Sequence, residues 1–132
     1  LIFDQLKKSP SDIPKIMMGY FNTVLQYGMT EFCQMCEQTG VSGIILPDLP
    51  IDIYLKEYKV TFEKHGLSNI FLITPETSEE RIRFIDNHST SFIYAVSSSS
   101  TTGKKQGIQD AESYLERLSK MELKHPIMVG FN

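Results

Sequence analysis

Several short patterns in this sequence contain residue types that could do chemistry, and the first is a pair of cysteines. Cys33-Gln34-Met35-Cys36 is a C-x-x-C pair, and such pairs act in redox reactions when they lie at a helix N-terminus, which stabilises the thiolate. Met29, Phe32, Cys33 and Cys36 recur at helical spacing, which places the pair well inside a helix. No second pair completes a zinc site. We therefore predict two buried thiols that pack as small apolar side chains.

The second pattern is Thr102-Gly103-Lys104, which looks like the end of a phosphate-binding P-loop. That motif needs a glycine at position 98, where this sequence has Ser98, and a Ser or Thr at position 105, where it has Lys105. The P-loop is therefore excluded. A Ser/Thr/Gly-rich loop after a strand can still offer N–H and hydroxyl donors to a phosphate. A plain mobile loop is the alternative, and these residues alone favour it.

A carboxylate, Asp48, lies between Pro47 and Pro50 directly after an apolar run. Two prolines stiffen the loop and hold the carboxylate in place. Asp48 could act as a general acid or base, or it could cap the helix that follows. The position favours capping or shaping of the loop.

The three histidines, His65, His88 and His125, each fall at a helix end or just before a strand. Those positions lie at the opposite end of the predicted strands from the loops that contain Asp48 and Thr102-Gly103. We expect solvated side chains near helix C-termini, where a positive charge is favourable.

The elements that must position these residues alternate between strands and helices. Continuous apolar runs predict parallel strands that are buried on both faces and covered by helices. Thr77 with Glu80 fits a capping box for one helix, and Asp110 fits the N-cap of another. The strands are expected at 16–21, 44–46, 70–73, 92–96 and 126–129, and the helices at 2–8, 29–39, 53–65, after 77 and from 110 to 121.

This β-α order fits an open doubly wound sheet or a closed (βα)8 barrel, and in both the chemistry gathers where strands end. We expect one domain over residues 1–132. The chain opens without Met, and both ends look cut, so we treat it as part of something longer.

Composition excludes several classes of protein. The 132 residues include 13 Lys plus Arg and 16 Asp plus Glu, a formal net charge of −3, which argues against a dedicated nucleic-acid binder. With 41% hydrophobic and 22% charged residues, the chain is globular. No apolar run reaches the length of a membrane span. Two cysteines make no disulfide scaffold, so we expect a reducing cytoplasm.

Taken together, the strand-end motifs resemble the tryptophan synthase alpha subunit family. The resemblance runs collinearly over nearly the whole chain, and P-D-L-P and Y-x-V-S-x-x-x-x-T-G are its most specific parts. The motifs that carry it are Met18-Gly19-Tyr20-Phe21-Asn22, Gly40-Val41-Ser42-Gly43, Leu46-Pro47-Asp48-Leu49-Pro50, Thr74-Pro75-Glu76-Thr77, Phe92-Ile93-Tyr94, Val96-Ser97, Thr102-Gly103 and Gly130-Phe131.

The resemblance implies a (βα)8 TIM barrel of about twice this length, of which this chain supplies strands three to seven. It also implies a lyase of tryptophan biosynthesis, which cleaves indole-3-glycerol phosphate to indole and glyceraldehyde 3-phosphate by a retro-aldol step. The implied partner is a beta subunit that carries pyridoxal phosphate, whereas the alpha subunit needs no cofactor and no metal.

Carried over by position, the resemblance assigns roles to individual residues. Large apolar and aromatic side chains at strand ends suit a flat apolar ring, and they would line the indole pocket: Met18, Tyr20, Ile45, Pro47, Leu72 and Tyr94. Thr102 and Gly103 would belong to the mobile loop over the phosphate, and Phe131 and Asn132 to the phosphate-binding turn. Asn22 and Pro50 would lie toward the beta subunit.

Three departures from the family pattern affect these expectations. Ser100 and Asn132 stand where the family usually has Gly. The family's catalytic Glu and Asp come from the strand-two region, upstream of Leu1, and nothing in this sequence replaces that acid/base pair. We therefore expect the chain alone to be inactive, and its open strand edges to promote self-association.

Two other functions remain as alternatives at this stage. One is another phosphate-binding barrel enzyme, against which Pro47-Asp48-Leu49-Pro50 argues. The other is a non-catalytic flavodoxin-like module, which needs acidic residues after its first strand and a Lys after its fifth. Tyr20-Phe21-Asn22 and Phe131-Asn132 occupy those places instead.

Overall fold

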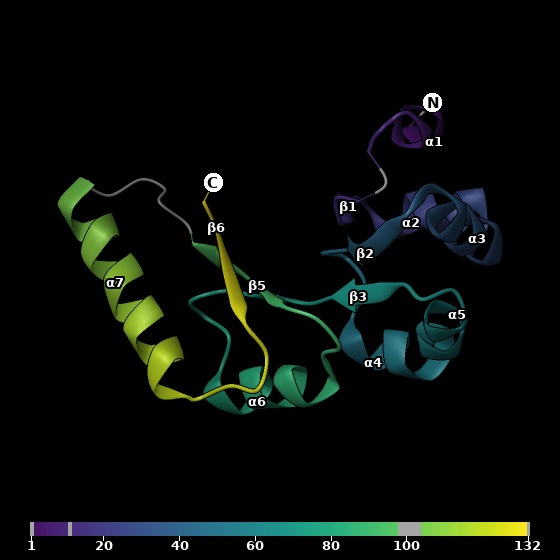
Figure 1. Cartoon of the computed structure of the whole chain (residues 1–132). Helices are drawn as coiled ribbons and strands as arrows, with labels where there is room; N and C mark the ends of the chain where they lie inside the picture. The colour runs from purple at the N-terminus through teal and green to yellow at the C-terminus, as the bar shows by residue number, and fades with distance from the viewer. Residues whose placement is uncertain (1, 11, 98–103, 132) are drawn as a thin grey trace. The chain divides into compact units, whose positions relative to one another are not determined.

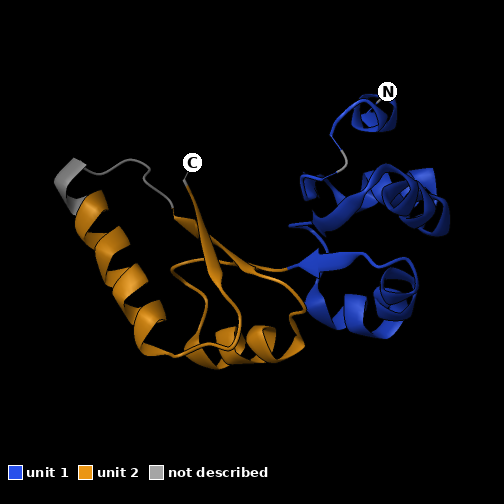
Figure 2. Cartoon of the chain, viewed as in Figure 1, with its two compact units in different colours: residues 1–70 blue, residues 71–132 orange. Residues whose placement is uncertain are grey.

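A computed structural model describes residues 2–10, 12–97 and 104–131 of the chain. The chain divides into two compact units, unit 1 (residues 1–70) and unit 2 (residues 71–132), which Figure 2 shows in blue and orange. Each unit contains a three-stranded sheet, and every strand pair among the described residues is parallel. The predicted parallel arrangement is confirmed. The strand expected at 70–73 is two strands, one in each sheet, so the described residues form six strands.

Unit 1 has the strand order β1-β2-β3, with α3 packed against β2 and α5 against β3. Its core includes the fully buried Cys33, Cys36, Ile44, Phe62 and Ile70. The elements, labelled in Figure 1, are α1 (Ile2–Lys7), β1 (Lys15–Met18), α2 (Phe21–Tyr27), α3 (Met29–Thr39), β2 (Val41–Ile45), α4 (Ile51–Ile53), the π-helix η1 (Tyr54–Tyr58), α5 (Lys59–Lys64) and β3 (Ser68–Ile70).

Helix α3 has the amphipathic pattern expected from the sequence, and it buries Cys33 and Cys36 completely. The helix ends at Gly40, whose φ of 76° lies in the left-handed region that glycine adopts without strain. Burial raises the pKa of Cys33 to about 11, and burial together with Cys33 raises that of Cys36 to about 12. The prediction of buried thiols is confirmed.

The helix expected over 53–65 begins two residues earlier, at Ile51, and it is interrupted in the middle. In η1 the Lys59 N–H donates to the Tyr54 carbonyl, five residues back, so one extra residue is accommodated in the turn. Phe62 and Tyr54 are buried with their rings in an edge-to-face contact at 5.2 Å.

Unit 2 has the strand order β4-β5-β6. The side chains of Ile73, Ile82, Ile93 and Ala95 are fully buried and form its core. Its elements are β4 (Leu72–Ile73), α6 (Glu79–His88), β5 (Ile93–Ser97), α7 (Lys104–Lys120) and β6 (Ile127–Phe131).

Three sequence predictions about element ends are wrong. The N-cap of α6 is Ser78, whose hydroxyl accepts from the Arg81 N–H at 3.2 Å, because the Thr77 hydroxyl is already accepting from the Thr74 N–H at 2.9 Å. Asp110 lies inside α7, which extends back to Lys104. Phe21, expected in the first strand, instead opens α2.

Candidate functional site

The first part of the candidate site lies at the carboxyl ends of β1 and β2. Met18 and Ile45 are direct partners in the parallel ladder, and the Gly19 N–H donates to the Ile45 carbonyl at 3.1 Å beyond the end of β1. Ile45 is buried, whereas 57% of Met18 and 70% of Tyr20 are exposed. The register of the ladder thus places two of the predicted pocket residues, Met18 and Ile45, side by side. Tyr20 follows Met18 by two residues.

Asp48 contacts this segment from the loop after β2. Its Oδ1 accepts a hydrogen bond of 2.7 Å from the backbone N–H of Phe21, the first residue of α2. The sequence suggested a cap for the helix that follows Asp48, so the expected kind of contact is present but on a different helix. No sequence spacing links residues 27 apart, although parallel strands place their following loops at one edge.

A cavity of about 500 Å³ lies in unit 1 beside β1, and Met18 and Tyr20 are among its lining residues. The remaining lining is largely apolar and comes from the N-terminal helices and the adjoining strands, including Phe3, Met17, Val24, Tyr27, Phe32 and Ile44. Ile45 and Pro47 do not line it. The cavity therefore includes only two of the predicted indole-pocket residues.

The second part of the candidate site lies in unit 2, where Leu72 and Tyr94 are direct partners between β4 and β5. Both side chains are half-buried. Gly130 of β6 leaves room for the Tyr94 ring, because a Cβ built on Gly130 would overlap the Tyr94 hydroxyl and ring carbons. Sequence reasoning missed this role of Gly130, and a glycine inside an apolar strand was the available signal.

The predicted phosphate-binding residues are mostly beyond what the structure describes. Thr102, Gly103 and Asn132, together with Ser100, lie outside the described residues. The backbone of Phe131 pairs with Ser97 at the end of the β5–β6 ladder. Its side chain is not among those described.

The two residues expected to face a partner subunit are both exposed. Asn22 is the second residue of α2, and Pro50 is the N-cap of α4, where its carbonyl accepts from the Tyr54 N–H at 3.0 Å. Asn22 is therefore one residue away from the backbone group that Asp48 holds.

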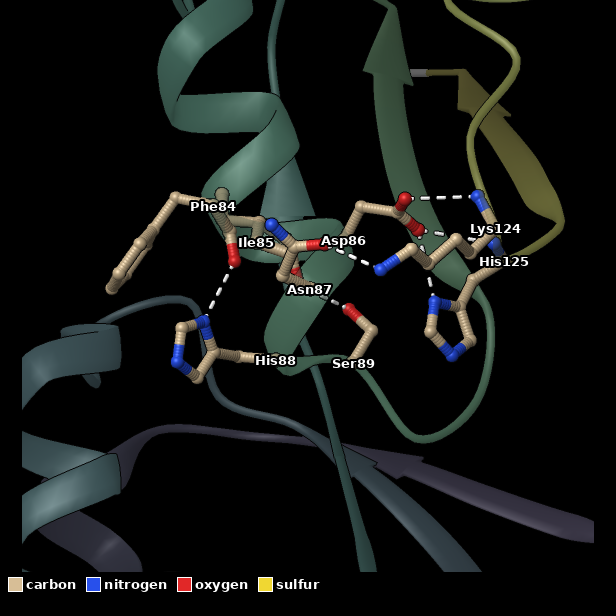
Figure 3. Close-up of polar contacts among 8 residues, drawn as sticks. All are labelled: Phe84, Ile85, Asp86, Asn87, His88, Ser89, Lys124 and His125. Atoms are coloured by element: carbon tan, nitrogen blue, oxygen red, sulfur yellow. Dashed lines mark hydrogen bonds and ion pairs between the residues drawn. The ribbon is translucent and has the colours of Figure 1, made fainter.

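The histidines lie at the element ends predicted from the sequence, but none is simply solvated. His65 Nδ1 lies 2.8 Å from the Glu37 carboxylate, and His88 Nδ1 lies 2.8 Å from the Phe84 carbonyl. Figure 3 shows the environment of His88 and of His125, whose Nδ1 lies 2.9 Å from Asp86 Oδ1.

Asp86 of α6 accepts hydrogen bonds from the segment before β6, and only 4% of it is exposed. Its two oxygens accept from the backbone N–H groups of Lys124 at 2.8 Å and His125 at 3.0 Å, in addition to the His125 ring contact (Figure 3). Burial alone would raise the pKa of Asp86, but these donors hold it below its ordinary value. The cluster fixes the chain before β6, and its geometry is that of a structural clamp.

Among the described residues, no group of three or more His, Cys, Asp or Glu side chains is placed to hold a metal ion. No helix in the part of the chain that the structure describes is long and apolar enough to cross a membrane.

Comparisons with known proteins agree over almost the whole chain. The family model described as tryptophan synthase alpha chain matches residues 2–132. The tryptophan synthase alpha chain of Flavobacterium psychrophilum is 55% identical over 134 aligned positions, which cover 99% of this chain and 53% of that protein. The protein of the same name from Flavobacterium johnsoniae is 54% identical, with the same coverage. This chain spans about half the length of the curated relatives it matches.

Solved structures give the same result. A structure of the tryptophan synthase α2β2 complex from Pyrococcus furiosus matches with a TM-score of 0.84 and 31% identity, over 98% of this chain and 53% of that one. The tryptophan synthase alpha chain of Legionella pneumophila matches with a TM-score of 0.80 and 33% identity, over 99% of this chain and 47% of that one. The predicted fold class, part of an α/β barrel with parallel strands, is confirmed.

Proposed function

Because the chain belongs to the tryptophan synthase alpha chain family, we propose that the protein containing it is a lyase of tryptophan biosynthesis. It cleaves the carbon–carbon bond of indole-3-glycerol phosphate and releases indole and glyceraldehyde 3-phosphate. Family membership also argues against both alternatives, another phosphate-binding barrel enzyme and a flavodoxin-like module.

The structural observation that best supports this proposal is the pairing of large side chains on neighbouring strands within each unit. Met18 pairs with Ile45, and Leu72 pairs with Tyr94. Side chains of this kind offer the flat apolar surface that an indole ring needs. Tyr20 and Pro47, each two residues beyond the end of β1 or β2, complete the proposed set.

The phosphate end of the substrate would contact residues that follow β5 and β6. We propose Thr102 and Gly103 for the loop that closes over the phosphate, and Phe131 and Asn132 for the turn that binds it. Backbone N–H groups and hydroxyls are suitable donors for a phosphate. Asn132 in place of the usual glycine is compatible with such a turn, because Asn tolerates left-handed φ values.

The proposal includes a beta subunit as the partner, contacted near Asn22 and Pro50, and a cytoplasmic location. Pyridoxal phosphate would belong to that subunit, and this chain would use no cofactor of its own. The α2β2 complex of Pyrococcus furiosus is consistent with such a partner.

The retro-aldol step needs an acid/base pair that protonates the indole ring and removes a hydroxyl proton. Asp48, the carboxylate that follows β2, is engaged with the Phe21 N–H, and the family resemblance places the acid/base pair before Leu1. We therefore propose that the 132-residue chain alone does not cleave the substrate.

The test is indole release from indole-3-glycerol phosphate by the chain alone, by a complementary segment with the missing strands and acid pair, and by their mixture. Release by the mixture alone is the expected result. Tyr94→Phe in the mixture should retain release, and Tyr94→Asp should reduce it at least tenfold, because a charge is costly in an apolar pocket. Release by the 132-residue chain alone would contradict the proposed inactivity. No release by the mixture, with both pieces folded and associated, would contradict the lyase assignment.

A further inference from the structure

Asp48 and the start of α2 are joined by a contact that the proposed chemistry does not use. We infer that Asp48 is a positioning residue that fixes the segment Tyr20–Asn22 through the backbone of Phe21. The inference rests on the proposed function, because Tyr20 is a proposed pocket residue and Asn22 a proposed partner contact.

The need for this contact arises from the sequence at the start of α2. The first N–H groups of a helix have no partner within the helix and are usually satisfied by a Ser, Thr, Asp or Asn at the N-cap. Here the N-cap is Tyr20, whose side chain makes no capping hydrogen bond within the described part of the chain. Asp48 supplies the missing acceptor from a distant loop, at 2.7 Å.

The contact is also favourable electrostatically. The first turn of α2, Phe21-Asn22-Thr23, carries no acidic side chain. A carboxylate at a helix N-terminus interacts favourably with the partial positive charge there, and a charge-assisted hydrogen bond is stronger than a neutral one.

The loop that carries Asp48 is itself fixed. The Leu49 N–H donates to the Leu46 carbonyl at 3.1 Å, which closes a turn with Pro47 and Asp48 at its two central positions. Proline is favoured at the first of these positions because its φ is already set. Leu46 and Leu49 are buried, so the turn is anchored on both sides of the carboxylate.

A second contact holds the same residue from another element. The ring of Phe21 meets the ring of Tyr58, at the end of η1, edge to face with centroids 5.3 Å apart. The extra residue of η1 lies in the turn that ends at Tyr58. Phe21 is thus held by its backbone at Asp48 and by its ring at Tyr58.

These contacts determine where the two neighbours of Phe21 point. Tyr20 and Asn22 are largely exposed, so their own packing does little to fix them. In this arrangement the Asp48 carboxylate acts as a hydrogen-bond acceptor and transfers no proton. A general acid or base would instead have to release or take up a proton during the reaction.

The experiment compares Asp48→Asn, Asp48→Ala and a control, Asp12→Asn, in the full-length protein that contains this chain. Asn is nearly isosteric with Asp and keeps an acceptor oxygen, whereas Ala keeps none. Asp12 is an exposed carboxylate in the loop between α1 and β1. Two readouts are needed: hydrogen exchange of the Phe21 amide by NMR, and kcat/KM for indole release.

We expect Asp48→Ala to raise the Phe21 amide exchange rate at least tenfold, without changing exchange at Ile44, and to lower kcat/KM at least tenfold. Asp48→Asn should lose less than about fivefold in kcat/KM, and Asp12→Asn should match the wild type in both readouts.

Unchanged exchange at Phe21 in Asp48→Ala would overturn the inference. So would a tenfold or larger loss of kcat/KM in Asp48→Asn with a protected Phe21 amide, because that result assigns Asp48 to proton transfer. A wild-type protein without indole release would contradict the proposed function instead, and the NMR measurements would still decide the role of Asp48.

Discussion

Replacing Asp86 should destabilise unit 2 by an amount that depends on pH. Asp86 accepts from the backbone N–H groups of Lys124 and His125 and contacts the His125 ring. An Asp86→Ala change leaves those donors without their acceptor in a site where only 4% of the residue is exposed. Each orphaned buried donor costs about 1–3 kcal/mol, and water can reach part of the exposed Lys124, so we expect a loss of about 3 kcal/mol in the free energy of unfolding.

An Asp86→Asn change should cost less at neutral pH, about 1–2 kcal/mol, because one amide oxygen still accepts but the NH2 group faces a donor. The pKa of Asp86 in the folded protein is held below its ordinary value, so the carboxylate stabilises the fold above the unfolded-state pKa of about 4. That contribution is lost as the pH falls through the lower folded-state pKa. The difference between wild type and Asp86→Asn should therefore be present at pH 7 and shrink below about pH 4.

Urea unfolding followed by circular dichroism, at one fixed protein concentration and at several pH values, measures this difference. Lys124→Ala is the matched control, because it removes the Nζ contact with Asn87 and keeps the backbone N–H that Asp86 binds. The control should lose less than about 0.5 kcal/mol. A loss below about 0.5 kcal/mol in Asp86→Ala, or an equal difference at pH 3 and pH 7, would refute the account of Asp86 as a clamp that must be ionised.

Three further predictions concern other contacts. Gly130→Ala should displace the Tyr94 ring, which NMR of the ring protons would detect, and should lower the free energy of unfolding by about 1–3 kcal/mol. Gly19→Ala is the control, because a Cβ at Gly19 meets no described atom within 4 Å. Cys33 and Cys36, whose pKa values are raised by burial to about 11 and about 12, should react with a thiol reagent at pH 8 only as fast as the protein unfolds, and rapid labelling of the native protein would contradict their burial. The isolated 132-residue chain should self-associate through the exposed edge of β1, and light scattering that gives a monodisperse monomer would count against this.

Most of the order of strands and helices could be read from the sequence because its causes are local, although α2 was not predicted. Strands buried on both faces show continuous apolar runs, and the run Gly43-Ile44-Ile45-Leu46 is buried throughout. Gly40 and Gly66 follow α3 and α5 with φ values of 76° and 64°, because a left-handed residue ends many helices. The helix ends that depend on competition between neighbouring hydroxyls were less predictable, as Ser78 in place of Thr77 illustrates.

Contacts between distant segments could not be predicted in the same way. Asp86 and His125 are 39 residues apart, and neither residue type specifies the other as its partner. The sequence placed His125 before a strand but gave no sign of the buried carboxylate beside it. The division of the 70–73 run between two sheets depends likewise on which neighbour each strand pairs with.

The apolar surface of the proposed site and its acid/base chemistry depend on different residues. Within each unit the ladder register alone pairs Met18 with Ile45 and Leu72 with Tyr94, so the apolar surface that we propose for the indole ring depends only on the formation of these sheets. Proton transfer needs a separate acid/base pair, and Asp48, the carboxylate that follows β2, is engaged with the backbone of Phe21. We therefore expect substrate binding and bond cleavage to be separable, because the proposed apolar surface and the proposed acid/base pair come from different parts of the protein.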